Sequence, residues 1–483
     1  MKLGTRSAIV ALTTLISLAL LGSASVAFGA PNAWPMARHD AAQTSRSPYV
    51  GPSAPALQWQ VESGGGLQGP PTIDASGTIY VGGGDRFYAV GADGAVEREF
   101  ASGVAVPWLD EAGTFYASSA GGFSAIYPDD TVKWTSPVAV SSLPVIDASG
   151  TTYLDGGGLA IYSNGTQKWS HTWPAGGYVA VGSDQTAYAS DGGTLVALNA
   201  SGTVNWQWWA GSSAITLGQP VHDDSNGMTY VCGLDGGKVY AVDRNGHLTW
   251  AFTTNSTHVY VSPGLGPDGT LYVSASNSRL YALRPSGSLK WSVSTLPGRT
   301  QSWSSLAVDA SGAVYGLLSD SVLGHGYRDV LAVNSAGKIE WRYAISETDL
   351  SSPVIGPGGT LYLVCWSVLD PHPWVGARLY AIGQASSGVS IGSNRSTVRI
   401  GQQAILSGSV TDTRTIGQVM DVQVKKPYKT HWSYSSNRRI YTSAGLALWQ
   451  YKYTFIPGMT KGTYRFMARY GGLYSTSVAV TLR

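Results

Sequence analysis

The chain has 483 residues, of which 43% are hydrophobic, 12% are charged and 61 are glycine. This composition is typical of short strands joined by many turns, and it argues against a helical bundle or a disordered chain. The length allows two or three domains. The formal net charge of +2 gives no reason to expect a nucleic-acid partner.

The first 29 residues have the features of a secretory signal peptide. Lys2 and Arg6 form a basic start, residues 8–21 are apolar, and small residues follow at 23–29. The apolar stretch is too short to favour a membrane span, and no later stretch is long enough to cross a bilayer. No cysteine lies near the expected cleavage site. The sequence therefore predicts a secreted or cell-envelope protein that is not a lipoprotein.

Residues 30–385 contain a pattern that recurs eight times. Each copy has an Asp-x-x-Gly turn followed by a short strand with a tyrosine, and these tyrosines are 35 to 47 residues apart. They are Tyr80, Tyr116, Tyr153, Tyr188, Tyr230, Tyr272, Tyr315 and Tyr362. This period is expected of four-stranded propeller blades, because a small sheet buries both faces only by packing against its neighbours in a ring.

The second half of each copy has an alanine, a glycine five residues later and a tryptophan nine residues later, as in Ala241, Gly246 and Trp250. We expect these tryptophans to pack between blades. The first copy has Arg98 in place of the tryptophan, and the last copy ends at Gly383 without a fourth strand. A spare fourth-strand segment, residues 56–60, precedes the first copy. We therefore expect it to complete the last blade of an all-β, eight-bladed propeller, with seven blades and an insertion as the alternative.

Residues 386–483 lose the repeat after a small polar linker and show about seven strands, which suits a small β-sandwich. They contain 13 Lys and Arg against 2 Asp and Glu, whereas residues 31–385 contain 16 against 27. We expect the basic domain to bind an anionic cell-wall polymer through Lys425, Lys426, Lys429, Arg438 and Arg439. The acidic propeller is a competing partner, and a solvated basic surface is the other alternative.

The eight copies resemble the PQQ-like β-propeller family, which includes quinoprotein dehydrogenases and BamB-type assembly proteins. The similarity lies in Asp-x-x-Gly-Thr-x-Tyr-Val followed by Tyr-Ala-x-Asn/Asp-x-x-Gly-x-x-x-Trp, and in the start at Trp34-Pro35-Met36-Ala37-Arg38-His39-Asp40. The C-terminal segment resembles bacterial Ig-like domains, through residues 396–401, 406–410 and 462–466. The resemblance implies a propeller fold but no particular activity.

The chemistry-bearing residues give little sign of catalysis. The quinoprotein resemblance would imply a quinone over a metal ion, but adjacent cysteines are missing, and Gly246 stands alone where that family usually has Thr-Gly. Asp74, Asp110, Asp147 and Asp309 sit at equivalent turn positions, where aspartate caps its own backbone. The histidines show no metal-ligand spacing. The sequence therefore predicts no catalytic residues, no cofactor and no metal.

Aromatic residues outside the repeat register form the last signal. Several fall between a fourth strand and the next first strand, where loop aromatics can form platforms for sugars or partner side chains. The predicted binding residues are Trp173, Trp209, Tyr260 and Trp303. The expected function is a non-catalytic scaffold that binds a protein or glycan at the cell envelope. The alternative is a quinone-dependent oxidoreductase or a glycan-active enzyme that uses the propeller's central depression.

Overall fold

A computed structural model describes residues 33–483, except 63–66, 84–85, 101–106, 120–121, 139–143, 155–157, 172–176, 213, 260–261, 296–300, 304–305, 321–327, 346–348, 367–376, 385–391, 394–396, 400–402, 412–418, 426–432, 440–445, 455–456, 458, 471–472 and 475–477. The described residues form β-strands and a single 3-10 turn, η2 (Pro357–Gly359). The predicted signal peptide lies outside them. No helix among the described residues is long and apolar enough to cross a membrane.

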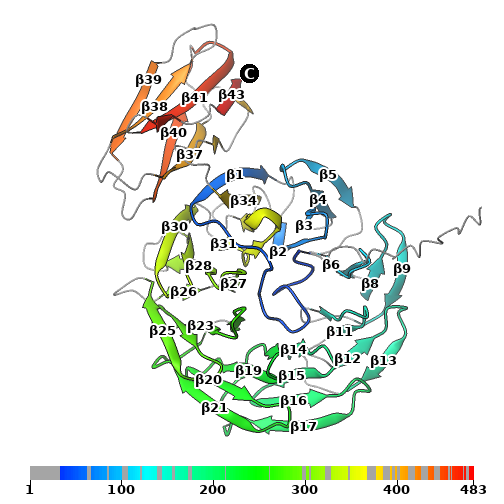
Figure 1. Ribbon diagram of the computed structural model, residues 1–483. Coiled ribbons are helices and arrows are strands. Elements are labelled where there is room, and N and C mark those ends of the chain that lie inside the picture. The colour runs from blue at the N-terminus through cyan, green and yellow to red at the C-terminus, as the bar shows by residue number, and fades with distance from the viewer. Residues whose placement is uncertain are drawn as a thin grey trace, which may run out of the picture. The chain divides into compact units, whose positions relative to one another are not determined.

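Residues up to 384 form eight sheets, numbered here one to eight in chain order (Figure 1). Sheets one to four are β2 (Leu67–Ile73), β3 (Ile79–Gly83), β4 (Arg86–Val90) and β5 (Val96–Phe100); β6 (Trp108–Leu109), β7 (Phe115–Ser119), β8 (Gly122–Ile126) and β9 (Val132–Ser136); β10 (Val145–Ile146), β11 (Thr152–Leu154), β12 (Leu159–Ile161) and β13 (Gln167–Ser170); and β14 (Tyr178–Val181), β15 (Ala187–Asp191), β16 (Thr194–Leu198) and β17 (Val204–Trp209).

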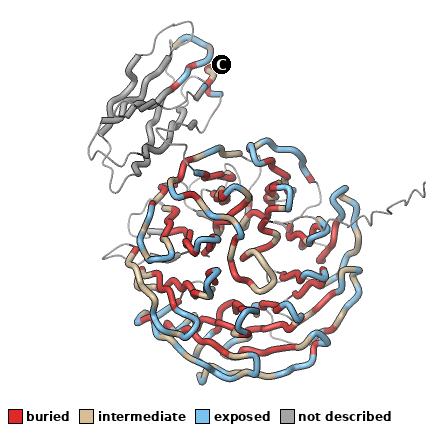
Figure 2. The backbone as a smooth tube through the Cα atoms, in the orientation of Figure 1, coloured by how far each residue is buried: buried red, intermediate tan, exposed pale blue. Residues whose placement is uncertain are grey.

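Sheets five to eight continue the ring. They are β18 (Val221–Asp223), β19 (Met228–Gly233), β20 (Lys238–Val242) and β21 (Leu248–Thr253); β22 (Gly264–Leu265), β23 (Leu271–Ala275), β24 (Arg279–Leu283) and β25 (Leu289–Ser294); β26 (Gln301–Trp303), β27 (Ala307–Val308), β28 (Val314–Asp320), β29 (Arg328–Val333) and β30 (Ile339–Ile345); and β31 (Asp349–Leu350), β32 (Val354–Ile355), β33 (Leu361–Trp366), β34 (Arg378–Gln384) and β1 (Pro55–Glu62). The two middle strands of a sheet are largely buried and the outermost strand alternates with solvent (Figure 2).

The ring closes by the predicted strand exchange. β1 pairs antiparallel with β34, from Pro55 opposite Gln384 to Glu62 opposite Arg378, with a bulge between Leu57 and Trp59. The N-terminal strand is therefore the outermost strand of sheet eight, where the last copy has none of its own. This pairing removes the open edge that β34 would otherwise expose.

A tryptophan on the outermost strand joins most sheets to the next one. At five junctions its indole lies over a glycine turn between the third and fourth strands of the neighbouring sheet, and its Nε1–H donates to a carbonyl in that turn. At the junction of sheets seven and eight, Trp341 donates instead to the Pro52 carbonyl in the segment before β1. The bonds are Trp59 to Ala92, Trp134 to Ser163, Trp206 to Arg244, Trp250 to Pro285, Trp291 to Ser335 and Trp341 to Pro52, at 2.7–3.0 Å. Gly287 shows why glycine is required, since its φ is +82° and a Cβ there would be 2.5 Å from Trp250.

Two junctions lack the tryptophan N–H bond and have a different contact in its place. At the first, Arg98 replaces the tryptophan and donates Nη1–H to the carbonyl of Pro128. At the third, Trp169 lies over Gly202 but its buried Nε1 has no partner, while His171 Nε2 contacts the Gly202 carbonyl. Sheets one and two are therefore joined by a side-chain bond even though the first copy has no tryptophan.

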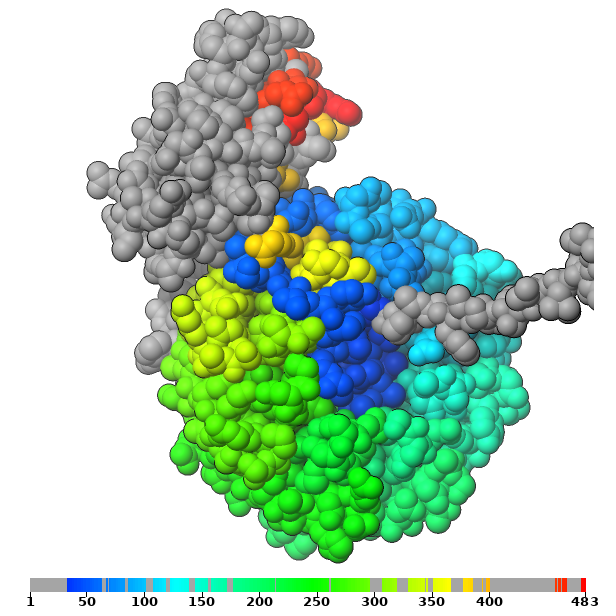
Figure 3. Space-filling model, viewed as in Figure 1, coloured from blue at the N-terminus to red at the C-terminus, as the bar shows by residue number. Residues whose placement is uncertain are grey.

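An N-terminal segment, residues 34–50, crosses the centre of the ring; we call it the crossing segment (Figures 1 and 3). Its backbone pairs with the innermost strands or their flanks in sheets one, two, four, five, six and seven. The bonds are Trp34 with Ile73, Leu109 to Pro35, Val181 to Ala41, His222 to Ala42, Leu265 to Thr44, and Val308 to Ser45. The hydroxyl of Ser47 reaches the Ile355 carbonyl of sheet eight. The crossing segment therefore satisfies polar backbone groups that would otherwise face the axis.

The described part of residues 392–483 forms two further sheets. The first contains β35 (Gly392–Ser393), β37 (Gln403–Thr411) and β40 (Leu446–Thr454); the second contains β36 (Thr397–Val398), β43 (Val478–Leu482), β41 (Gly462–Tyr470), β38 (Val419–Lys425) and β39 (Ser433–Arg439), with β42 (Leu473–Tyr474) beside β41. Two sheets agree with a sandwich, and the Ig-like assignment stays a prediction. Cys232 and Cys365 are both buried and are not joined by a disulfide.

The closing strand can be tested by deletion of residues 54–61. We expect loss of the cooperative melting transition, or a large fall in its midpoint, because the deletion leaves β34 as an open edge. Circular dichroism measures the transition, with Val96→Thr at an exposed position of β5 as the control. A midpoint within a degree or two of the parent would contradict the role of β1, since a small shift corresponds to only about 1 kcal/mol.

The indole bond can be tested by comparing two substitutions. Trp341→Phe removes the bond to Pro52, whereas Trp169→Phe removes an indole whose N–H has no partner. Both side chains are buried, so the loss of packing is similar. We expect Trp341→Phe to lower the free energy of unfolding by about 1 kcal/mol more than Trp169→Phe. Urea denaturation measures the difference, and equal losses would show that the bond contributes nothing.

Candidate functional site

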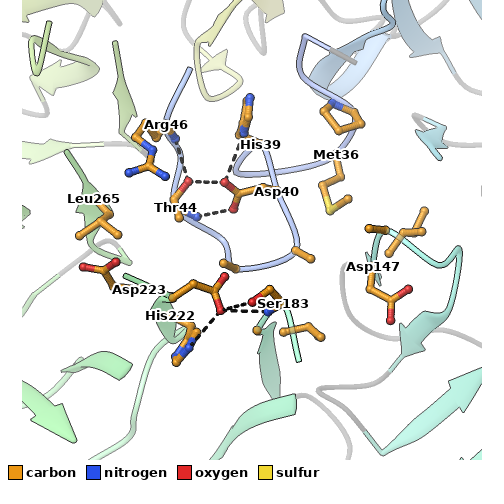
Figure 4. A pocket seen from close by; sticks show the side chains of 18 of the residues that line it. Met36, His39, Asp40, Thr44, Arg46, Asp147, Ser183, His222, Asp223 and Leu265 are labelled. Atoms are coloured by element: carbon orange, nitrogen blue, oxygen red, sulfur yellow. Dashed lines mark hydrogen bonds and ion pairs between the residues drawn. The ribbon is translucent and has the colours of Figure 1, made fainter. Parts of the chain in front are cut away.

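A cavity of about 820 Å³ opens at the ring axis; we call it the central pocket (Figure 4). Its wall consists of the turns between first and second strands in sheets two to six. Its floor is part of the crossing segment, from Pro35 to Arg46. The short first strands bring these turns to the axis, because each repeat begins at the centre of the ring.

The repeated aspartates in the wall have structural roles. Asp147 Oδ1 accepts hydrogen bonds from the backbone N–H groups of Ser149 and Thr151 at 2.9 and 3.0 Å. Its Oδ2 accepts from the Tyr153 hydroxyl at 3.1 Å. Burial, with the charge of Asp147, raises the pKa of Tyr153, so this hydroxyl stays protonated and donates. Asp74, Asp110 and Asp309 make the same bonds, which confirms their predicted role as turn caps.

A second group of polar residues joins sheets four and five. Asp224 Oδ1 accepts from the Ser183 N–H at 2.9 Å and from its hydroxyl at 2.8 Å, and lies 3.6 Å from His222 Nε2. His222 Nδ1 is 3.0 Å from the Thr229 hydroxyl, and its ring stacks on Tyr188 at 4.3 Å. Burial lowers the pKa of His222 and outweighs the neighbouring carboxylates, so the imidazole is neutral at neutral pH.

Asp40 supplies the carboxylate of the pocket floor. It accepts a bond from the Thr44 N–H at 2.8 Å and another from the Thr44 hydroxyl, and lies 3.4 Å from His39 Nδ1. Burial alone would raise the pKa of Asp40, but the bonds from His39 and Thr44 outweigh it, so the pKa is lowered and the group is ionised. The turn that presents it has positive φ at Arg38 (63°) and His39 (79°). Such strain in non-glycine residues is often found at functional sites.

The central pocket is strongly negative. Its lining includes the carboxylates of Asp40, Asp110, Glu111, Asp147, Asp223 and Asp224, and among the described lining residues Arg46 is the one Lys or Arg. Low-dielectric walls concentrate such a field and attract positive ligands. Pyrroloquinoline quinone is a tricarboxylate and does not fit this lining. No group of three potential metal ligands is present among the described residues.

The predicted aromatic site is only partly described. Trp173 and Tyr260 lie outside the described residues. Trp209 and Trp303 were expected on connections but lie in strands, at the ends of β17 and β26. Trp209 is 59% exposed. β17 begins at the turn after β16 and runs away from it, so Trp209 lies at the face opposite the central pocket. Trp209, whose side chain is described, therefore does not line the central pocket.

The predicted polymer-binding residues are also divided. Lys425 ends β38, and Arg438 and Arg439 end β39. Lys426 and Lys429 lie outside the described residues. Sequence reasoning missed the pocket residues Asp40, Asp224 and His222. The positions of Asp40 and His222 depend on the crossing segment, and the repeat pattern contains no signal for it.

Neutral, buried His222 should make the protein sensitive to mild acid. The unfolded chain binds the proton more readily than the folded one, so stability falls as pH drops below the ordinary histidine pKa of 6.5. We expect His222→Gln to flatten the fall in the free energy of unfolding between about pH 7 and about pH 5. Urea titrations at several pH values measure it. Parallel pH curves for variant and parent would contradict the assignment.

Three comparisons with known proteins bear on the fold. The family described as outer membrane protein assembly factor BamB matches residues 155–390. No curated protein matches the chain at significant similarity. The crystal structure of BamB from Moraxella catarrhalis has 16% identity and a TM-score of 0.47, and covers 67% of this chain and 99% of that one.

Virginiamycin B lyase from Staphylococcus aureus has 11% identity and a TM-score of 0.42, and covers 68% of this chain and 99% of the lyase. At these levels neither protein's activity transfers to this chain. The family match covers about half of the chain and agrees with its four-stranded sheets. Residues 155–390 are therefore similar to the repeats of the BamB family, and the sheets are those of a PQQ-like β-propeller.

Proposed function

We propose that this chain is an exported, non-catalytic scaffold of the cell envelope. In this proposal the propeller binds a protein partner, and the basic C-terminal domain tethers it to an anionic polymer. The observation that carries the proposal is the central pocket, in which carboxylates outnumber cations and several are fixed by turn bonds. Carboxylates that cap turns are poorly placed for proton transfer but form a permanent negative surface.

The partner group that suits this pocket is a lysine or arginine side chain on an exposed peptide segment. Glu111 is exposed at the rim, whereas Asp40 is ionised at the floor. A long cationic side chain could reach from one to the other, with its alkyl part against the apolar lining of Met36, Ile146 and Leu265. Charge complementarity of this kind raises association rates and selects partners.

The opposite face of the propeller is proposed as a second contact surface. Exposed aromatic side chains there would offer flat area to a protein or glycan, and Trp209 is its described member. The C-terminal tether rests on the large excess of cations in residues 386–483. Lys425, Lys426, Lys429, Arg438 and Arg439 remain the proposed polymer-binding residues.

The pocket proposal is tested with a short arginine-rich peptide and an uncharged peptide of equal length. We expect only the first to bind, with an affinity that falls as salt is raised. Glu111→Gln should slow association, since rim charges act mainly on the encounter. Surface plasmon resonance measures the rates. Glu97→Gln, at an exposed position of β5 outside the pocket, is the matched control. Equal binding of both peptides, or equal effects of the two variants, would contradict the proposal.

A further inference from the structure

The second C-terminal sheet has a buried face and an exposed face. On β41 and β43, Tyr464, Phe466, Val480 and Leu482 are at most 1% exposed. Their neighbours Thr463, Arg465 and Ala479 are exposed. β36 follows the same alternation, with Val398 buried between exposed Thr397 and Arg399. This period of two fixes which residues face outward.

Exposed cations gather at one end of this sheet; we call Arg399, Lys461, Arg465 and Arg483 the cationic row. Val398 and Gly462 both pair with Leu482, on either side of β43, and Arg483 N–H donates to the Val398 carbonyl at 3.1 Å. Arg399, Arg483 and Lys461 therefore end three neighbouring strands. Adjacent strands are about 4.8 Å apart, so these three backbone positions span only about 10 Å.

The row continues along β41. Arg465 lies four residues beyond Lys461, about 13 Å along the strand. Lys425 of β38 is the backbone partner of Arg465 in the register of β38 and β41. Residues 386–483 contain 13 Lys and Arg against 2 Asp and Glu, so cations dominate this domain.

We propose that the cationic row binds a linear phosphodiester polymer, an inference that rests on the tether proposed above and extends its site across β36, β43 and β41. Three of the four residues are arginines, whose planar guanidinium pairs with phosphate through two parallel bonds. Arg399, Arg483 and Lys461 place one cation at the end of each of three neighbouring strands, and a polymer with one phosphate per repeat carries its charges in a similar single line. A folded acidic protein would need a contact of about 800 Å² on each partner.

The test uses the full chain and immobilised poly(glycerol phosphate). The row variant is Arg399→Gln, Lys461→Gln, Arg465→Gln and Arg483→Gln. The matched control removes the same charge from the propeller, through Lys238→Gln, Arg244→Gln, Arg284→Gln and Lys338→Gln at exposed positions. We expect the row variant to bind about tenfold more weakly, because four individually weak ion pairs are lost, and the control to bind like the parent. The melting transition of each variant checks its fold, and Arg465→Gln alone should give a smaller loss in the same direction.

The other outcomes separate the two proposals. Binding of the row variant like the parent would leave the tether to other residues and overturn the cationic row. Equal or tighter binding of the parent to a polyuronate would overturn the phosphodiester assignment. Salt-dependent self-association in place of polymer binding would identify the acidic propeller of a second copy as the partner. No binding of the parent to any polyanion at low salt would overturn the tether itself.

Discussion

The propeller depends on one repeated contact, an indole on the outermost strand of a sheet laid over a glycine turn of the next. The contact combines apolar burial with an N–H bond to a turn carbonyl, and it is possible only where the turn has no Cβ. Each sheet is too small to be stable alone, so packing at the junctions between sheets supplies the missing stability. At the junction of sheets seven and eight the turn is missing, and the Pro52 carbonyl in the segment before β1 accepts the Trp341 bond in its place.

The crossing segment joins the sheets to one another at the centre of the ring, as the tryptophans do at its outside. A ring of first strands leaves polar backbone groups and empty space around its axis. Residues 34–50 satisfy these groups in sheet after sheet, and in doing so they form the floor of the central pocket. The pocket therefore forms where the crossing segment covers the centre of the ring. Part of its charge follows from the repeat, since Asp110, Asp147 and Asp223 each cap amides of their own wall turn.

The repeat explains how much could be predicted from sequence. The spacing of Tyr153 and its counterparts predicted the four-stranded sheets, and the displaced segment around Trp59 predicted the strand that closes the ring. Both predictions were possible because each pattern can be recognised in a short stretch of sequence. Arg98 was identified as a missing tryptophan, but its bond to Pro128 depends on a neighbouring sheet. Trp209 was placed on a connection because the length of a strand after its tryptophan has no local signal. Asp40 and His222 line the same pocket only in the folded protein, so their sequence positions did not indicate a common site.

The strand exchange also fixes when the molecule can fold. β1 is made among the first strands, yet its partner β34 ends at Gln384, more than three hundred residues later. The crossing segment likewise contacts sheets that are synthesised long after it. Contacts so distant in the chain slow folding and delay it until the late segments exist. The N-terminal strand and the crossing segment therefore wait for their partners until the last sheet has been made, and the ring closes only then.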